Sequence, residues 1–255
     1  MDLSRSNSAA FEGFLRNQKG FALTFLLTLL PVLLAAAFLL LFSQYHLKNW
    51  MQSLHICRST LLDTQEKVGR QLKDLMDLNP QARSLRVALQ IAYAELAAGY
   101  ATENPQLVAQ ALRDIARIRR MQRALDTLQK SYILNGNLDM MAGVQKVIRE
   151  LRAQDQWNQA HMPAILSFRI YGIHPQPAVL AVKPDRPDTA PVYELENDFT
   201  QKQALHVSWT SEFSTQGRES LQWLKNHHKK NQSCGASLKS QGLGYSEILQ
   251  GDKLF

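Results

Sequence analysis

The sequence predicts an α+β protein, in which a single N-terminal transmembrane helix continues into a helical hairpin or bundle and a small antiparallel β-sheet domain follows. Three observations support this prediction. Residues 20–42 contain no charged side chain, and their number matches the roughly 20 apolar residues that an α-helix needs to cross a bilayer. Residues 44–154 show apolar side chains at helical spacing. Beyond residue 162, prolines cluster among short β-rich runs, which is typical of strands joined by turns.

Four regions are predicted along the chain of 255 residues. Residues 1–19 form a short polar leader, for which we expect disorder or a short extension of the following helix. Residues 20–43 form the transmembrane helix. Residues 44–155 form the helical region, and residues 156–255 form the strand-rich region.

The apolar segment has three interpretations. A cleaved signal peptide has an apolar region of about 7–15 residues before a small-residue cleavage site, whereas here the small residues 35–37 are followed by more apolar side chains. The second interpretation is a plain anchor helix. The third is a pilin-type segment with a processing junction at its start, because a basic residue and a glycine directly precede the helix, at Lys19, Gly20 and Phe21.

A proline stands in the middle of this segment and begins the motif Pro31, Val32, Leu33 and Leu34. Proline frees one backbone carbonyl and bends a helix, which membrane helices tolerate. Together with the Lys19-Gly20 pair, this motif resembles the N-terminal segment of the TadE/TadG-like proteins of tight-adherence (Flp) pilus systems. The resemblance covers residues 18–45.

The resemblance implies a membrane-anchored, non-enzymatic accessory or minor-pilin-like protein of a tight-adherence or type IV-like pilus apparatus. The implied partners are other pilin-like or pilus-assembly proteins. No cofactor is expected, because the sequence has no cofactor-binding motif. Prepilin peptidases cleave after the glycine at such a junction. Pilins usually carry Glu at the fifth position after it, where this chain has Phe25, so cleavage after Gly20 stays an open question.

The expected location is the bacterial inner membrane, crossed once, with the N-terminus in the cytoplasm and the bulk of the chain in the periplasm. The pilin-like junction favours this orientation. Basic residues are slightly more frequent before the segment than after it, which agrees weakly with the positive-inside rule. The net charge of +7 suits an anionic partner, but we expect no nucleic acid because the soluble part lies outside the cytoplasm.

After the membrane, the helix is predicted to continue as a heptad-like seam that packs against other helices or a second copy. Thr64, Gln65 and Gln71 interrupt the seam, and Asn79-Pro80 ends the helix because the residue before a proline avoids the α region. The seam residues recur every seventh position: Leu47, Leu54, Leu61, Val68 and Leu75.

Three further helices are predicted, over residues 81–101, 105–133 and 137–154. Asn104 is a suitable cap for the second of them, and Asn135-Gly136 is expected to end it. The buried faces of the last two are predicted to contain Val108, Ala111, Leu112, Ile115, Ile118, Leu125, Leu128, Leu138, Met141, Val144, Ile148 and Leu151.

Short strands are predicted over residues 165–171, 178–182, 192–195 and 204–210, because β-branched and aromatic residues alternate there between turns. A short helix is expected over residues 219–226. From Asn231 onwards the chain is rich in glycine and serine, and we expect a loop.

Two features suggest contacts. Cys57 and Cys234 are the two cysteines; in an oxidising compartment they read either as one disulfide or as two unpaired thiols. A basic stripe on the third helix reads either as a contact with anionic lipid or an acidic partner, or as a solvated face. It consists of Arg113, Arg117 and Arg120.

No motif for catalysis or metal binding is found in the sequence, and the basic cluster at residues 227–230 reads as a solvated turn. The alternative to a pilus component is a tethered periplasmic ligand-binding or sensor module. The leader is too short for a cytoplasmic output domain, so in this alternative the anchor serves mainly as a tether.

Overall fold

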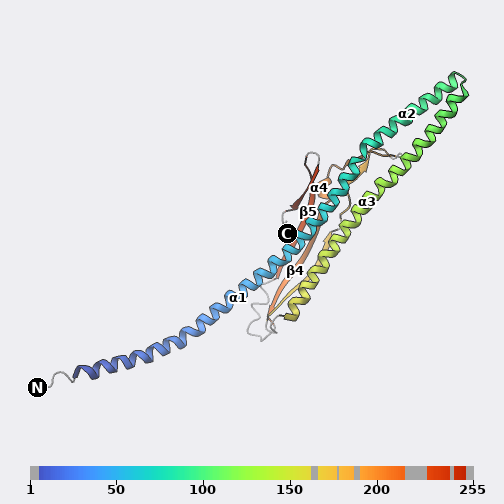
Figure 1. Ribbon diagram of the computed structural model, residues 1–255. Coiled ribbons are helices and arrows are strands. Elements are labelled where there is room, and N and C mark those ends of the chain that lie inside the picture. Colours follow the sequence, from blue (N-terminus) through green and yellow to red (C-terminus); the bar gives the residue numbers. More distant parts are fainter. Residues whose placement is uncertain are drawn as a thin grey trace. The chain divides into compact units, whose positions relative to one another are not determined.

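Helix α1 (Ser6–Asp77) contains 72 residues and includes the whole charge-free segment, with Pro31 inside it (Figure 1). The computed structural model describes residues 6–161, 166–176, 178–186, 190–215, 229–241 and 244–250. Within these ranges, one helix is long and apolar enough to cross a membrane, and it lies near the N-terminus. Because α1 begins at Ser6, the leader continues the helix, which was one of the two expectations for it.

The chain divides into two compact units, Met1–Met51 and Gln52–Phe255. The first unit contains the N-terminal part of α1 with the apolar segment. The second contains the remainder of α1 and every other described element. The predicted helical and strand-rich regions beyond Gln52 therefore belong to one compact unit, and the predicted α+β class is confirmed.

Helices α2 (Asn79–Ala101) and α3 (Pro105–His161) form a hairpin in the second unit. A proline in the first turn of α2 ends α1 and starts the next helix, as the position of Pro80 predicts. Asn104 caps α3 as predicted: its Oδ1 accepts hydrogen bonds from the backbone N–H groups of Gln106 (3.1 Å) and Leu107 (3.3 Å).

The prediction that Asn135-Gly136 ends a helix is wrong, because α3 continues through it as one helix of 57 residues. These residues support a contact with the segment before β2 instead. A Cβ on Gly136 would lie 3.5 Å from Leu180 Cδ2, and Asn137 Oδ1 accepts a 2.8 Å hydrogen bond from the backbone N–H of Leu180. Packing against this segment outweighs the local preference of Asn-Gly to stop a helix.

Because α3 is one continuous helix, its buried residues follow a single helical periodicity along its whole length. Four residues that were predicted to be buried are exposed. These are Leu112, Leu128, Leu138 and Met141. Polar or small residues take several of the buried positions, including Gln122, Gln129, Gly136 and Gly143. The other eight residues predicted on these faces include seven that are buried: Ala111, Ile115, Ile118, Leu125, Val144, Ile148 and Leu151.

A four-stranded antiparallel sheet has the strand order β1-β4-β5-β6. Its strands are β1 (Leu166–Gln176), β4 (Leu205–Thr215), β5 (Lys229–Gln241) and β6 (Gly244–Gln250). A second sheet pairs β2 (Val182–Pro184) with β3 (Tyr193–Leu195), and the short helix α4 (Phe199–Lys202) precedes β4. The predicted strand over 178–182 overlaps β2 at Val182 only, and the predicted helix over 219–226 lies outside the described residues.

The prediction of a loop from Asn231 is wrong, because β5 and β6 occupy this region. Along β5, Cys234, Ala236 and Leu238 are fully or almost fully buried. The glycine and serine residues that suggested a loop are small enough to be enclosed here: Ser237 is fully buried, and its hydroxyl donates a hydrogen bond to the Thr200 carbonyl. Close packing thus accounts for a composition that otherwise favours turns.

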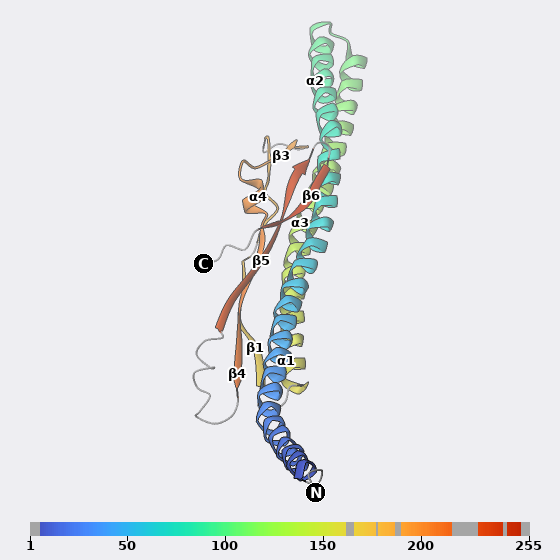
Figure 2. The ribbon, with the colours of Figure 1, turned by 90° about the vertical axis from the view of Figure 1, so that its left-hand side faces the viewer.

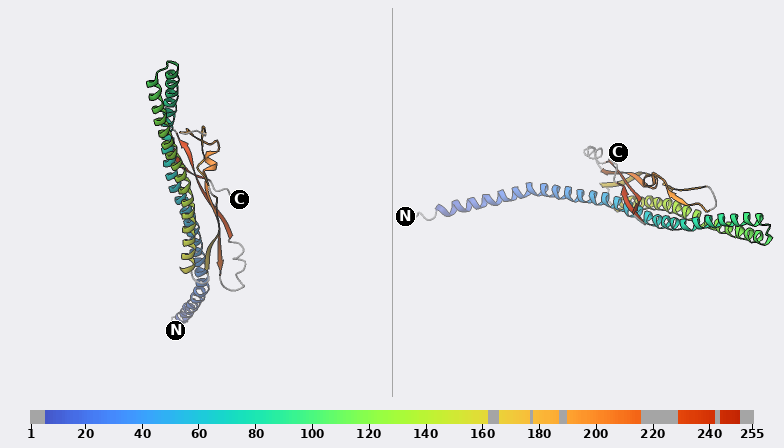
Figure 3. Two further views of the ribbon diagram at one scale, coloured as in Figure 1. Left: turned by 90° about the vertical axis from the view of Figure 1, so that its right-hand side faces the viewer. Right: turned by 90° about the horizontal axis from the view of Figure 1, so that it is seen from above.

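Within the second unit, the sheet lies beside α1 and α3, which run antiparallel to each other (Figures 2 and 3). Polar contacts join the two helices. Thr60 Oγ1 donates to Glu150 Oε2 (3.0 Å), and Gln71 Nε2 donates to Asp139 Oδ2 (2.6 Å). Towards the hairpin end, α2 and α3 share an apolar core with the segment before β3: Ala82, Leu85, Ala92, Ile115, Ile118, Leu125, Ala190 and Val192.

Gly143 marks a close approach of α3 to α1. A Cβ added there would lie 2.8 Å from Thr64 Cβ and closer still to the Thr64 Oγ1 and Cγ2 atoms. We expect Gly143→Ala to lower the free energy of unfolding by about 2 kcal/mol, because overpacking must be relieved by backbone movement. Denaturation of the full chain in a non-ionic detergent measures the change.

Gly136→Ala is the matched control, because its nearest neighbour is the flexible end of Gln71 at 3.2 Å. Alanine favours a helix interior over glycine by about 1 kcal/mol, so this variant should be neutral or more stable. Adding Thr64→Ala to Gly143→Ala should recover most of the loss. Equal losses for the two glycine variants would contradict the close approach at Gly143.

Candidate functional site

The first unit presents an apolar helix surface. In the described part of this unit, the side chains of Val32, Leu33 and Leu34 are 65%, 56% and 61% exposed. Pro31 has no N–H to donate to the carbonyl one turn earlier, so this backbone acceptor is freed inside the apolar segment. The residues of the predicted junction lie within α1: Lys19, Gly20 and Phe21. The structure describes the backbone of these residues and not their side chains.

The predicted seam is divided between the two units. Leu61, Val68 and Leu75 are fully buried in the second unit. Leu54 is partly buried there, whereas Leu47 belongs to the first unit and is 49% exposed. The seam from Leu61 onwards therefore packs inside this chain. Self-association through the seam required these residues to be exposed to a second helix, and they are not.

Polar residues of α1 hold the sheet in place next to this seam. Gln65 Nε2 donates to the Gln203 carbonyl (2.9 Å) and to the Ala236 carbonyl (3.2 Å). Ser53 Oγ donates to Gln232 Oε1 (3.1 Å). The sequence suggested that Gln65 interrupts an apolar seam, but its amide connects α1 to β5 and to the residue that follows α4.

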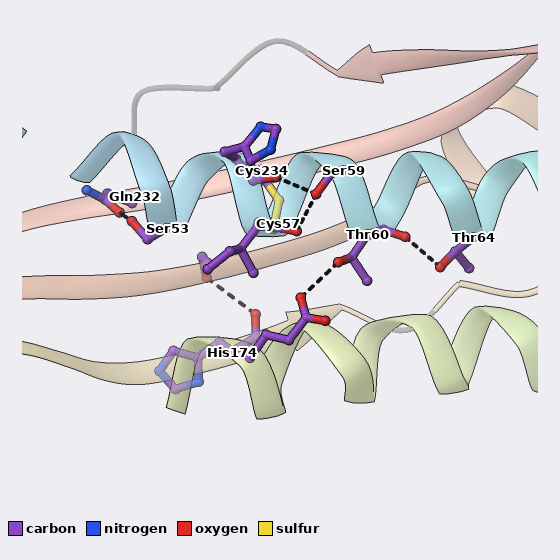
Figure 4. Close-up of a disulfide and its surroundings, with 12 residues drawn as sticks. Ser53, Cys57, Ser59, Thr60, Thr64, His174, Gln232 and Cys234 are labelled. Atoms are coloured by element: carbon purple, nitrogen blue, oxygen red, sulfur yellow. Dashed lines mark hydrogen bonds between the residues drawn. A yellow bond between two sulfur atoms is a disulfide. The ribbon is translucent and has the colours of Figure 1, made fainter. Parts of the chain in front are cut away.

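Cys57 and Cys234 form a disulfide in the structure, with their Cα atoms 6.3 Å apart. Figure 4 shows Ser53 and Cys57 on α1 facing Gln232 and Cys234 on β5. Both cysteines are buried. We call the disulfide, the Ser53–Gln232 hydrogen bond and the Gln65 hydrogen bonds the α1–β5 clasp.

The predicted basic stripe lies on the surface of α3, where Arg113, Arg117 and Arg120 are all exposed. None of the three forms an ion pair with an acidic residue in the described part of the chain. The stripe lies on a single helix and does not line the cavity described next.

A cavity of about 620 Å³ lies between α2, α3 and the residues after β2. Arginines dominate its lining: Arg86, Leu89, Gln90, Arg119, Gln122, Arg123 and Arg186. We call it the arginine cavity. Its arginines come from three separate parts of the chain, because Arg86 is on α2, Arg119 and Arg123 are on α3, and Arg186 follows β2.

Arg86 is fixed at one side of the arginine cavity. Its two terminal nitrogens donate to the two carboxylate oxygens of Asp185 (2.6 and 2.8 Å), and its Nε donates to the Ala190 carbonyl (3.0 Å). Asp185 also accepts the backbone N–H of Val192 (2.9 Å). The hydrogen bond from Arg86 is the main reason that the pKa of Asp185 lies well below its ordinary value; burial acts in the opposite direction.

Arg119 and Arg123 are one helical turn apart on α3. The Arg119 guanidinium donates a hydrogen bond to the Tyr93 hydroxyl, and its carbon atom lies 5.9 Å from the centre of the Tyr93 ring, within cation–π range. Arg123 Nε donates to the Arg119 carbonyl at 3.5 Å. The aromatic face thus orients one of these two arginines.

None of the four arginines of the cavity belongs to the predicted stripe of Arg113, Arg117 and Arg120. Arg119 and Arg123 are four residues apart in the sequence. Their convergence with α2 and with the turn after β2 depends on tertiary structure. In the described ranges no group of three His, Cys, Asp or Glu side chains could hold a metal ion, and His227 and His228 lie outside these ranges.

The disulfide of the clasp should contribute strongly to stability, because it joins residues 177 positions apart and so restricts the unfolded chain. We expect the Cys57→Ala/Cys234→Ala variant to lose about 2–5 kcal/mol of unfolding free energy. Denaturation of the full chain with and without a reductant measures this. The reductant should destabilise the natural chain and leave the variant unchanged; a variant as stable as the oxidised chain would contradict this role.

The Arg86–Asp185 pair should make stability depend on pH. Since the folded-state pKa of Asp185 is lowered, its contribution is complete above the unfolded-state value of about 3.9 and is lost as the pH falls through the folded-state pKa. We expect Asp185→Asn to cost about 1–2 kcal/mol at pH 7, and the difference from the natural chain to shrink below pH 4.

Asp63→Asn is the control, because Asp63 pairs with Lys67 one turn away and both side chains are about half exposed (47% and 50%). Such surface pairs contribute at most about 1 kcal/mol. Thermal unfolding of the three proteins between pH 7 and pH 2.5 gives the comparison. A difference between Asp185→Asn and the natural chain that persists undiminished at the lowest pH would contradict the assignment.

Comparison with known proteins found no family model, no curated protein and no solved structure that matches this chain. The resemblance of residues 18–45 to the tight-adherence proteins therefore stays a prediction. What the chain does must be inferred from its apolar helix, its clasp and its arginine cavity.

Proposed function

We propose that this chain is a membrane-anchored, non-enzymatic component of a tight-adherence or type IV-like pilus apparatus, acting through helix–helix and surface contacts. The observation that carries the proposal is the apolar part of α1. It is free of charge, follows a basic-glycine junction and continues without a break into the helix that organises the second unit. A long helix that leaves the membrane and joins a C-terminal sheet is the general arrangement of pilin-like proteins.

The clasp supports a periplasmic location for the second unit. Disulfides persist in oxidising compartments and are rare in the cytoplasm, and Cys57 and Cys234 are joined here. A periplasmic second unit places the short leader in the cytoplasm, where a prepilin peptidase would meet Lys19 and Gly20. The slight excess of basic residues in the leader favours the same orientation.

The contacts with partner helices are assigned to the first unit. The buried state of Leu61, Val68 and Leu75 leaves the exposed apolar residues from Phe25 to Leu41 as the surface for such contacts. Helices associate in lipid mainly through close packing, for which small residues are favourable. Residues 35–37 are three consecutive alanines, which span about 200° of the helix circumference at this level.

A crosslinking experiment tests this proposal in native membranes. A photo-crosslinking residue replaces Leu34, and in a second variant it replaces Ser59, which is exposed on α1 in the second unit. We expect position 34 to capture pilin-like or pilus-assembly membrane proteins with high yield and position 59 to capture few or none. Mass spectrometry of the same protein determines whether it begins after Gly20.

The result that removes the proposal is an intact leader combined with no pilus-assembly protein captured from position 34. Cleavage after Gly20 with such partners supports a processed pilin-like role. An intact leader with such partners supports an assembly protein that stays in the membrane.

A further inference from the structure

We infer that the arginine cavity binds a small polyanion that carries phosphate groups. This inference does not depend on the proposed pilus role. It rests on the charge of the cavity, on the way its side chains are held and on its size.

The cavity lining has a large excess of positive charge. Among the described residues, four arginines and no acidic residue line it, and Asp185 forms its ion pair with Arg86. Arg119, Arg123 and Arg186 form no ion pair with any acidic residue in the described ranges. Like charges one helical turn apart cost a helix a few tenths of a kcal/mol, and an anion bound between Arg119 and Arg123 would offset this repulsion.

The side chains are partly ordered before a ligand arrives. Asp185 and the Ala190 carbonyl hold Arg86, and the Tyr93 ring and hydroxyl hold Arg119. Gln122 is almost fully buried, and its Nε2 lies 3.5 Å from the Leu85 carbonyl as donor. Such ordering reduces the entropy that binding costs.

Phosphate fits this arrangement better than a carboxylate does. The Asp185 carboxylate already uses both of its oxygens on a single guanidinium, that of Arg86. A terminal phosphate has three acceptor oxygens and carries close to two negative charges, so it can accept from several arginines at once. A volume of about 620 Å³ exceeds the needs of one phosphate and lies within the range of small-molecule sites, which favours a ligand with two or more phosphates.

Tripolyphosphate is a suitable probe for the full chain in a non-ionic detergent. Isothermal titration at physiological ionic strength should show saturable binding to the natural chain. Arg119→Gln/Arg123→Gln should weaken this binding at least tenfold. Arg113→Gln/Arg117→Gln is the matched control, because it removes the same charge from the same helix outside the cavity, and it should bind as the natural chain does.

The inference is overturned if the natural chain does not bind tripolyphosphate, or if both double variants lose affinity equally. Thermal unfolding tests whether both variants are folded. If Arg119→Gln/Arg123→Gln is not folded, Arg186→Gln replaces it, and its affinity for tripolyphosphate should be at least threefold lower than that of the natural chain. Citrate tests the chemical class, and binding as tight as that of tripolyphosphate would refute the preference for phosphate.

The phosphate could belong to a soluble compound or to a lipid headgroup, and a second titration distinguishes these sources. It is repeated in mixed micelles that contain phosphatidic acid. If the natural chain and Arg113→Gln/Arg117→Gln both lose tripolyphosphate binding in these micelles, the lipid headgroup occupies the cavity, and the site is assigned to a headgroup. Unchanged binding assigns it to a soluble polyphosphate or phosphorylated metabolite, and either result supports a phosphate site.

Discussion

A disulfide and three buried hydrogen bonds fix helix α1 to strand β5 and its surroundings. This attachment has wide consequences because β5 is an inner strand, paired with β4 on one side and β6 on the other. Holding β5 therefore holds the four-stranded sheet. Gln65 extends the attachment to Gln203, directly after α4, so that one amide also fixes the start of β4. Without the clasp, the sheet would depend on α3 and on its own apolar face.

Helix α3 connects the sheet to the arginine cavity. Near its C-terminal end, Asp155 Oδ1 accepts a 2.8 Å hydrogen bond from the backbone N–H of Ile170 in β1. In its middle, Gly143 allows α1 to approach closely, and nearer its N-terminal end Arg119 and Arg123 line the cavity. An uninterrupted helix is stiff over this length, so the sheet, the helix pair and the cavity share one rigid support inside the second unit.

Much of the fold could be predicted from local signals. The charge-free segment, the proline at the start of α2 and the Asn104 cap depend on neighbours in sequence, and each has its expected place. The continuous α3 and the strand β5 could not be predicted in this way, because Gly136 and the small residues of β5 are explained by close packing with distant segments. The arginine cavity depends on three segments that converge only in the folded chain, so spacing along the sequence predicted none of its four arginines as a site.

The buried glutamines have a consequence for how the helices align. Gln65, Gln122 and Gln129 lie at positions where apolar side chains are usual, and each donates to a main-chain carbonyl of another segment. An apolar seam would pack almost equally well after a slide of one heptad, about 10 Å along the helix axis. The same slide would separate Gln65 from its acceptors, and of Gln122 and Gln129, which are seven residues apart, only one could reach the acceptor of the other. A buried polar group without a partner is costly. The glutamines therefore favour the observed axial alignment of the long helices over one that is shifted by a heptad.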